Sequence, residues 1–169
     1  MHLNVSLKME KSLERSLARR IIRSSFRSLR EDGFVHSKPT FAVRPTEYLA
    51  AFIHIHKFSY GPMFRLHFGI RVLNDPFEAV ALNGPSLEHA GKYSAQEESI
   101  ERCIGDIERF IRGDGLPWLI RYGDIDSLLA SETPLKERDR VALEAHLAGS
   151  PSIENVKQTS ALLGLDKHD

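Results

Sequence analysis

Two neighbouring segments decide the fold of this chain: YLAAFIHIHKF at residues 48–58 and MFRLHFGIRVL at residues 63–73, with the sequence SYGP between them. Both segments are rich in aromatic and β-branched residues, and stretches of both alternate apolar with polar side chains, which is typical of β-strands. Because SYGP has the composition of a turn, we expect the two strands to form an antiparallel hairpin.

The register of this hairpin determines which side chains share a face. If Phe58 lies opposite Met63, one face is apolar and the other carries imidazole and basic side chains. The expected pairs are Ile53–Phe68 and Ile55–Leu66 on the apolar face, and His54–His67 and His56–Arg65 on the other face.

The flanking sequence predicts helices on both sides of these strands. A helical period runs from about residue 7 to residue 30 and ends at Gly33, and two shorter strands are expected at 34–36 and 40–44. Residues 74–93 are irregular and predict a loop, with at most a short strand. A further helix is expected to stop at a sharp turn over 113–118, and well-delimited helices are expected within 133–149 and 150–164.

This order of elements predicts an α+β fold. We expect an N-terminal helix, an antiparallel β-meander of about four strands with one face covered by helices, and C-terminal helices. The 169 residues are enough for a single domain, in which residues 133–169 form a helical pair and the first eight or so residues are disordered.

The lone cysteine, Cys103, excludes an intramolecular disulfide and a cysteine-based zinc site, and it suits a reducing compartment. No apolar run approaches the ~20 residues of a membrane span, and the N-terminus lacks the pattern of a signal peptide. We therefore expect a cytoplasmic protein. Cys103 falls in the apolar stripe of its helix and is expected to be a core residue rather than a nucleophile.

Three short sequences occur in order along the chain: FIHIHKF at 52–58, FGIRV at 68–72 and LPW at 116–118. Together they resemble a bacterial family catalogued as domain of unknown function 4304. Its matching features here are Gly33, Phe34, Phe41 and Lys57, whereas His56 stands where a glutamine is often found. The resemblance covers most of residues 9–130 and implies a fold, but it implies no activity and no cofactor.

The sharpest chemical feature is the group formed by His54, His56 and His67 on one face of the hairpin. Three imidazoles could supply three corners of a zinc site and leave the fourth for an activated water, which is how a metal-dependent hydrolase is built. The alternatives are a solvated sheet face and a pH-sensitive partner surface. Because no carboxylate partner can be located for these histidines, we expect no bound metal and no cofactor.

The second feature is a basic stripe on the first helix. Residues 1–30 carry eight Lys and Arg against two Glu, so their charge is +6, and the rest of this electrically neutral chain carries −6. Seven of these cations recur every three or four residues, which places them on one helical face: Lys8, Lys11, Arg15, Arg19, Arg23, Arg27 and Arg30. This face could be solvated and partly paired with the protein's own carboxylates, could bind an acidic protein, or could bind nucleic acid or an anionic membrane.

These observations predict a non-enzymatic protein-interaction module whose partner-binding residues are Arg15, Arg19, Arg23 and Arg27. The first alternative is a metal-dependent hydrolase that uses His54, His56 and His67. The second alternative is nucleic-acid binding through the basic helix. No catalytic residue is expected, because neither a phosphate-binding loop nor a nucleophile elbow occurs. Trp118 is expected to be a largely buried packing anchor between helices.

Overall fold

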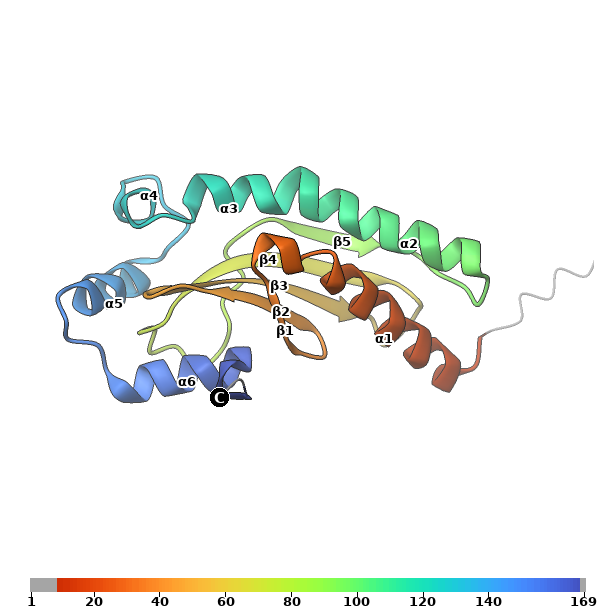
Figure 1. The fold of residues 1–169 in the computed structure, drawn as a ribbon, viewed down its shortest axis with the longest axis horizontal. Coiled ribbons are helices and arrows are strands. Elements are labelled where there is room, and N and C mark those ends of the chain that lie inside the picture. The colour runs from red at the N-terminus through yellow and green to blue at the C-terminus, as the bar shows by residue number, and fades with distance from the viewer. Residues whose placement is uncertain (1–8, 168–169) are drawn as a thin grey trace, which may run out of the picture.

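The centre of the fold is a five-stranded antiparallel sheet, which Figure 1 shows in a computed structural model that describes residues 9–167. The strands are neighbours in the order in which they occur along the chain, so the sheet is a simple meander. They are β1 (Val35–Lys38), β2 (Phe41–Pro45), β3 (Leu49–Lys57), β4 (Phe64–Val72) and β5 (Ser86–Ala90). The α+β class and the antiparallel meander are therefore as predicted.

The register predicted for the central hairpin is confirmed. β3 and β4 pair His54 with His67 and Ile53 with Phe68, and the residues between them follow the same register. The apolar members of these pairs are fully buried, because one face of the sheet packs against helices. Alternation along two strands and the length of one turn were enough to predict this pairing.

The sheet has one strand more than the four expected. Strand β5 lies within the segment 74–93, and its pairing with β4 shifts register between Phe64 and Leu66. Only five residues long and interrupted by a bulge, this strand has no clean alternation of apolar and polar residues that would reveal it in the sequence.

Two helices cover the apolar face of the sheet. They are α1 (Lys11–Arg27), followed by the short 3-10 helix η1 (Arg30–Asp32), and α2 (Glu97–Phe110). Gly33 follows η1 with a φ of 82°, the left-handed conformation expected for a glycine at a helix end. Helix α1 begins at Lys11, later than the start predicted near residue 7, because residues 9 and 10 are not helical. The predicted disorder of the first eight residues lies outside the described residues.

The expected sharp turn over residues 113–118 is wrong. Instead, a π-helical segment η2 (Ile111–Gly115) joins α2 to α3 (Leu116–Tyr122), and Figure 1 shows the three running on as one long helix. Gly115 is needed for close packing: a Cβ atom added there would lie 2.1 Å from the ring of Phe68. Gly115 therefore lets the helix approach the sheet. Pro117 occupies the first turn of α3, where proline is tolerated.

The remaining helices form the C-terminal third of the chain. They are α4 (Ile125–Leu129), α5 (Glu137–Leu147), α6 (Ile153–Leu163) and the 3-10 helix η3 (Leu165–Lys167). Helices α5 and α6 lie within the two segments predicted for the helical pair. Gly164 ends α6 with a φ of 72°, as expected from its place after the last apolar residues.

Helix α6 covers part of the second face of the sheet. The sequence predicted this helix but did not indicate that it packs on that face. Figure 1 shows α6 beneath the sheet, on the side opposite to α2. A second, smaller core lies there, made of Val43, Ala50, Phe52 and Leu163. The second face is therefore divided into a part closed by α6 and a part that carries the histidines.

Within residues 9–167, none of the helices combines the length and the apolar character needed to cross a bilayer.

Candidate functional site

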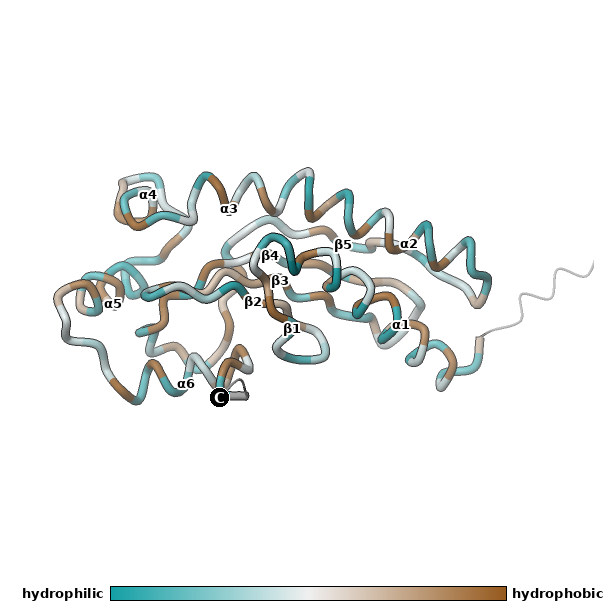
Figure 2. Tube along the Cα trace, in the orientation of Figure 1, coloured by the Kyte–Doolittle hydropathy of each residue, from teal (hydrophilic) through white to brown (hydrophobic). Residues whose placement is uncertain are grey.

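Helix α1 presents a row of arginines to solvent. Arg15, Arg19, Arg23 and Arg27 follow one another at intervals of four residues, and all four are exposed. The opposite side of α1 is buried in the main core through Ala18, Ile21, Ile22, Ser25 and Phe26. Figure 2 shows the resulting alternation of hydrophilic and hydrophobic turns along α1. We call these four residues the arginine row.

The arginine row is not neutralised by the carboxylates of the described residues. On the same helix, Arg20 pairs with Glu97 and Glu14 pairs with Lys57. Within residues 9–166, by contrast, no ion pair or side-chain hydrogen bond involves any member of the row. The possibility that the protein's own carboxylates partly pair this face therefore finds no support in the described part of the chain.

The row runs into a groove where α1 meets the edge of the sheet. This groove has a volume of about 540 Å³, and we call it the basic groove; it is lined by Arg23, Phe26, Arg27, Arg30, Phe34, Val35 and His36. The His36 ring lies edge-on to Phe26, with ring centroids 4.9 Å apart. Three guanidinium groups thus stand over a floor formed by aromatic residues and by the first strand of the sheet.

Sequence analysis identified Arg23, Arg27 and Arg30 but missed Val35 and His36. Those two residues belong to β1, and their place beside α1 depends on how the chain turns back at Gly33. The signal that could have indicated them is the short spacing between Arg30 and β1, because a strand that begins only five residues later must start close to the last arginine.

The basic groove is electrostatically suited to an anion. Like charges repel when they are held together without counter-charges, so three neighbouring guanidiniums raise the free energy of the empty groove. The C-terminal end of α1 offsets part of this repulsion, because its carbonyl dipoles favour cations such as Arg27. An anionic ligand would relieve the remaining repulsion between the arginines. Carboxylates and phosphates suit this role, because arginine forms bidentate hydrogen bonds with both.

The three histidines lie together on the second face of the sheet, as the predicted register requires. The ring centroids of His54 and His67 are 6.4 Å apart, and those of His54 and His56 are 5.9 Å apart. Phe41 of β2 stacks on His54 at 4.3 Å, so a ladder of rings crosses three strands. We call Phe41, His54 and His67 the ring ladder.

The geometry of the ring ladder does not resemble a metal site. The planes of His54 and His67 lie within 18° of parallel, so the two rings stack and do not point their nitrogens at a common centre. Throughout the described residues, no group of three or more His, Cys, Asp and Glu side chains is arranged to hold a metal ion. The hydrolase alternative therefore gains no support from the geometry.

Burial favours the neutral form of both histidines in the ring ladder. Burial first, and then the nearby His56 and His67, lower the pKa of His54 from 6.5 to about 4. The pKa of His67 is also lowered, first by burial and then by the positive charge of Arg65. His54 is therefore neutral at neutral pH, and the pKa of His67 is shifted in the same direction.

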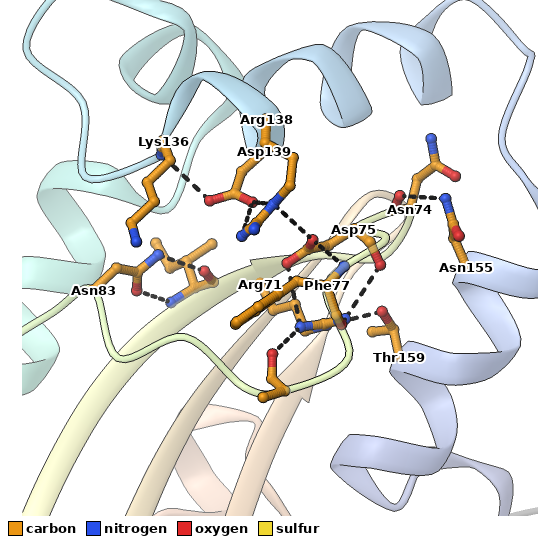
Figure 3. A network of polar contacts seen from close by, with 12 residues as sticks. Arg71, Asn74, Asp75, Phe77, Asn83, Lys136, Arg138, Asp139, Asn155 and Thr159 are labelled. Carbon is orange, nitrogen blue, oxygen red and sulfur yellow. Dashed lines mark hydrogen bonds and ion pairs between the residues drawn. The ribbon is translucent and has the colours of Figure 1, made fainter.

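A buried polar network lies beside the second core, and Figure 3 shows it from close by. Its centre is Arg71 of β4, which is 3% exposed. The Arg71 guanidinium lies 3.2 Å from the carboxylate of Asp75 and donates to the hydroxyl of Thr159 in α6 at 2.9 Å. It also donates to the carbonyl oxygens of Ala79 and Phe77, at 2.8 and 2.7 Å.

This network connects the sheet to the C-terminal helices. Asn74 donates to the carbonyl oxygen of Ala142 in α5 and accepts from the backbone of Ser152 at the start of α6. Asp75 also lies 3.6 Å from Arg138 of α5. Because all three nitrogens of the Arg71 guanidinium have partners, the network is structural and leaves no free group for a ligand.

Cys103 lies in the core, as predicted. It is fully buried, and burial, followed by the charge of Asp106, raises the pKa of its thiol to about 12. The thiol is therefore protonated at neutral pH and is a poor nucleophile.

The prediction for Trp118 needs correction. Trp118 is partly buried and packs against the main core, but it belongs to the same continuous helix as Ile104, Ile107 and Ile111 and does not pack across an angle against it. Its ring lies 5.6 Å from that of Tyr122 and covers the backbone at Gly84.

Comparison of the chain with protein-family models, with curated proteins and with solved structures finds no match. The resemblance to the 4304 family therefore remains a prediction, and any function has to be inferred from the residues of this chain.

Proposed function

We propose that this chain is a non-enzymatic protein-interaction module that binds an acidic segment of another protein through the arginine row. The observation that supports this proposal is that Arg15, Arg19, Arg23 and Arg27 are exposed and lack counter-charges among the described residues, although Arg20 on the same helix is paired. An acidic partner would supply the missing charges at the surface.

The charge of the rest of the chain favours a protein partner over nucleic acid. Residues 31–169 carry −6, which offsets the field of the arginine row beyond about one Debye length, ~8 Å at physiological ionic strength. A long phosphate backbone would extend past the arginine row and be repelled by the net negative charge of the rest of the chain. A short acidic segment would contact the row alone.

The test is a binding titration with a fluorescein-labelled oligo-glutamate peptide, followed by fluorescence anisotropy. We expect binding that weakens as salt is added, because exposed charges are screened. The double variant Arg19→Glu/Arg23→Glu is expected to lose at least about tenfold in affinity, since two attractive contacts become repulsive.

The matched control is Arg102→Glu, which reverses an exposed arginine of α2 outside the row. It should bind the peptide like the parent. A loss in this control equal to that of the single variant Arg19→Glu, which changes the net charge by the same amount, would show that only net charge matters and would overturn the proposal. Binding of a DNA duplex or single strand at physiological salt, lost in the double variant, together with no binding of the peptide, would favour the nucleic-acid alternative.

A further inference from the structure

The basic groove has a second wall that the proposed function does not use. This wall is β1, the first strand in the sheet order, whose only neighbouring strand in the described chain is β2. An edge strand exposes unpaired backbone N–H and C=O groups, which can pair with another strand. Val35 on this strand is 41% exposed, and His36 is exposed as well.

Only one end of β1 is open. At the other end, the Lys38 ammonium donates to the carbonyl oxygen of Leu162 at 2.7 Å, so the end of α6 lies against β1 there. A Cβ atom added to Gly164 would also lie within 2.9 Å of the Ser37 carbonyl oxygen. The accessible part of the edge is therefore Val35 and His36, which are also the two residues of β1 that line the basic groove.

The two faces of β1 differ in what they would offer an added strand. His36 pairs with Ala42 and contacts Phe26, so it lies on the face covered by α1. Val35 pairs with Val43 of the second core, so it lies on the opposite face. A strand added beside β1 would direct alternate side chains towards the arginines of α1, and the intervening side chains would lie next to Val35.

The spacing of the arginines matches that of alternate residues in an extended chain. Arg23 and Arg27 are four residues apart on α1, which corresponds to a rise of about 6 Å. Alternate residues of a strand are about 6.6 Å apart. A segment that runs along α1 can therefore place carboxylates at every second position opposite Arg23 and Arg27.

From this geometry we propose that the partner's segment binds as an extended strand beside β1 and alternates acidic with β-branched apolar residues. Its carboxylates face Arg23, Arg27 and Arg30, and its apolar side chains lie next to Val35. The inference rests on the proposed function, because it specifies the acidic segment that the arginine row binds.

Charge complementarity argues against a second copy of this chain as the molecule that pairs with the edge of β1. Edge-to-edge pairing of two β1 strands would bring together two copies of the sequence Val-His-Ser-Lys and two sets of groove arginines. Such pairing would place like charges side by side, and lysine on an edge strand is a common device against self-association. An acidic strand from another protein would relieve the same repulsion.

The experiment compares two labelled peptides of identical composition. One alternates Glu and Val, and the other carries all its Glu residues first and all its Val residues after them. Both have the same net charge, but the second peptide holds its carboxylates closer together, so the arginine row alone would attract it at least as strongly as the first. We expect the alternating peptide to bind roughly tenfold more tightly, because only it can place carboxylates and apolar side chains on opposite faces of one strand.

Val35→Ser tests the apolar contact. We expect this variant to bind the alternating peptide roughly three- to tenfold more weakly and to bind oligo-glutamate unchanged. The matched control is Val141→Ser, which replaces another exposed valine, on α5. A further measurement needs no variant: hydrogen exchange of the backbone amides at residues 35–37 should slow when the alternating peptide binds.

The outcomes separate this inference from the proposed function. If both peptides bind equally and Arg19→Glu/Arg23→Glu abolishes both, the acidic-segment module stands and strand addition is overturned. Unchanged exchange at residues 35–37 in the bound state also overturns strand addition. If neither these peptides nor oligo-glutamate binds, both proposals are overturned.

Discussion

The fold lowers the pKa of His54 well below that of a free histidine. Burial lowers its pKa from 6.5 to about 4, so the folded protein holds this imidazole neutral where the unfolded chain would protonate it. Above pH 6.5 both states are neutral. As the pH falls from 6.5 towards 4, the unfolded state gains a proton that the folded state does not, and the free energy of unfolding decreases.

We expect His54 to account for a loss of about 1 kcal/mol in the free energy of unfolding between pH 7 and pH 5, after allowance for its partial exposure. Urea unfolding at the two pH values measures this loss. His54→Gln should reduce the loss, and His56→Gln should reduce it less, because His56 is only the second cause of the lowered pKa of His54. A pH dependence that is identical in the parent and in His54→Gln contradicts the expectation.

At the level of elements, the junction between α2 and α3 shows why a glycine in the sequence does not always mark a turn. Gly113 and Gly115 both lie in η2, but only Gly115 has a close neighbour, the buried ring of Phe68. We expect Gly115→Ala to decrease the free energy of unfolding by about 1–3 kcal/mol, because the added methyl group must displace a packed ring.

The control for this change is Gly113→Ala, since a Cβ atom there would meet nothing within 4 Å. It should be neutral or raise the free energy of unfolding by about 0.5–1 kcal/mol, because alanine loses less backbone entropy than glycine in a helix. Thermal or urea unfolding compares the two variants. Equal effects would mean that the approach of Gly115 to Phe68 does not limit the packing of this helix.

The elements that sequence analysis predicted correctly are those determined by local patterns. Alternation through His54 and His67 and the length of the SYGP turn determine the hairpin, and Gly33 and Gly164 end their helices for reasons that lie within a few residues. The role of Gly115 was missed because it depends on Phe68, which is distant in sequence. The basic groove was missed for a similar reason, since Val35 and His36 acquire their role only when β1 lies beside α1.

At the level of the whole molecule, Arg71 and its partners tie the C-terminal third of the chain to the sheet. We expect Arg71→Met to decrease the free energy of unfolding by about 3–5 kcal/mol, because it leaves the buried carboxylate of Asp75 without its closest counter-charge. The double variant Arg71→Met/Asp75→Asn should recover part of this loss. Urea unfolding measures both, and a double variant less stable than Arg71→Met would contradict this explanation.

The contact between Lys38 and Leu162 joins residues 124 positions apart. All pairings within the sheet, by contrast, are between strands adjacent in the chain, so they can form as soon as the corresponding stretch has been made. During synthesis on the ribosome, the meander can therefore assemble before α6 exists. Phe52 and its neighbours on the second face then lack the cover of Leu163 until α6 has emerged, and we expect chaperones to bind this apolar surface during that interval.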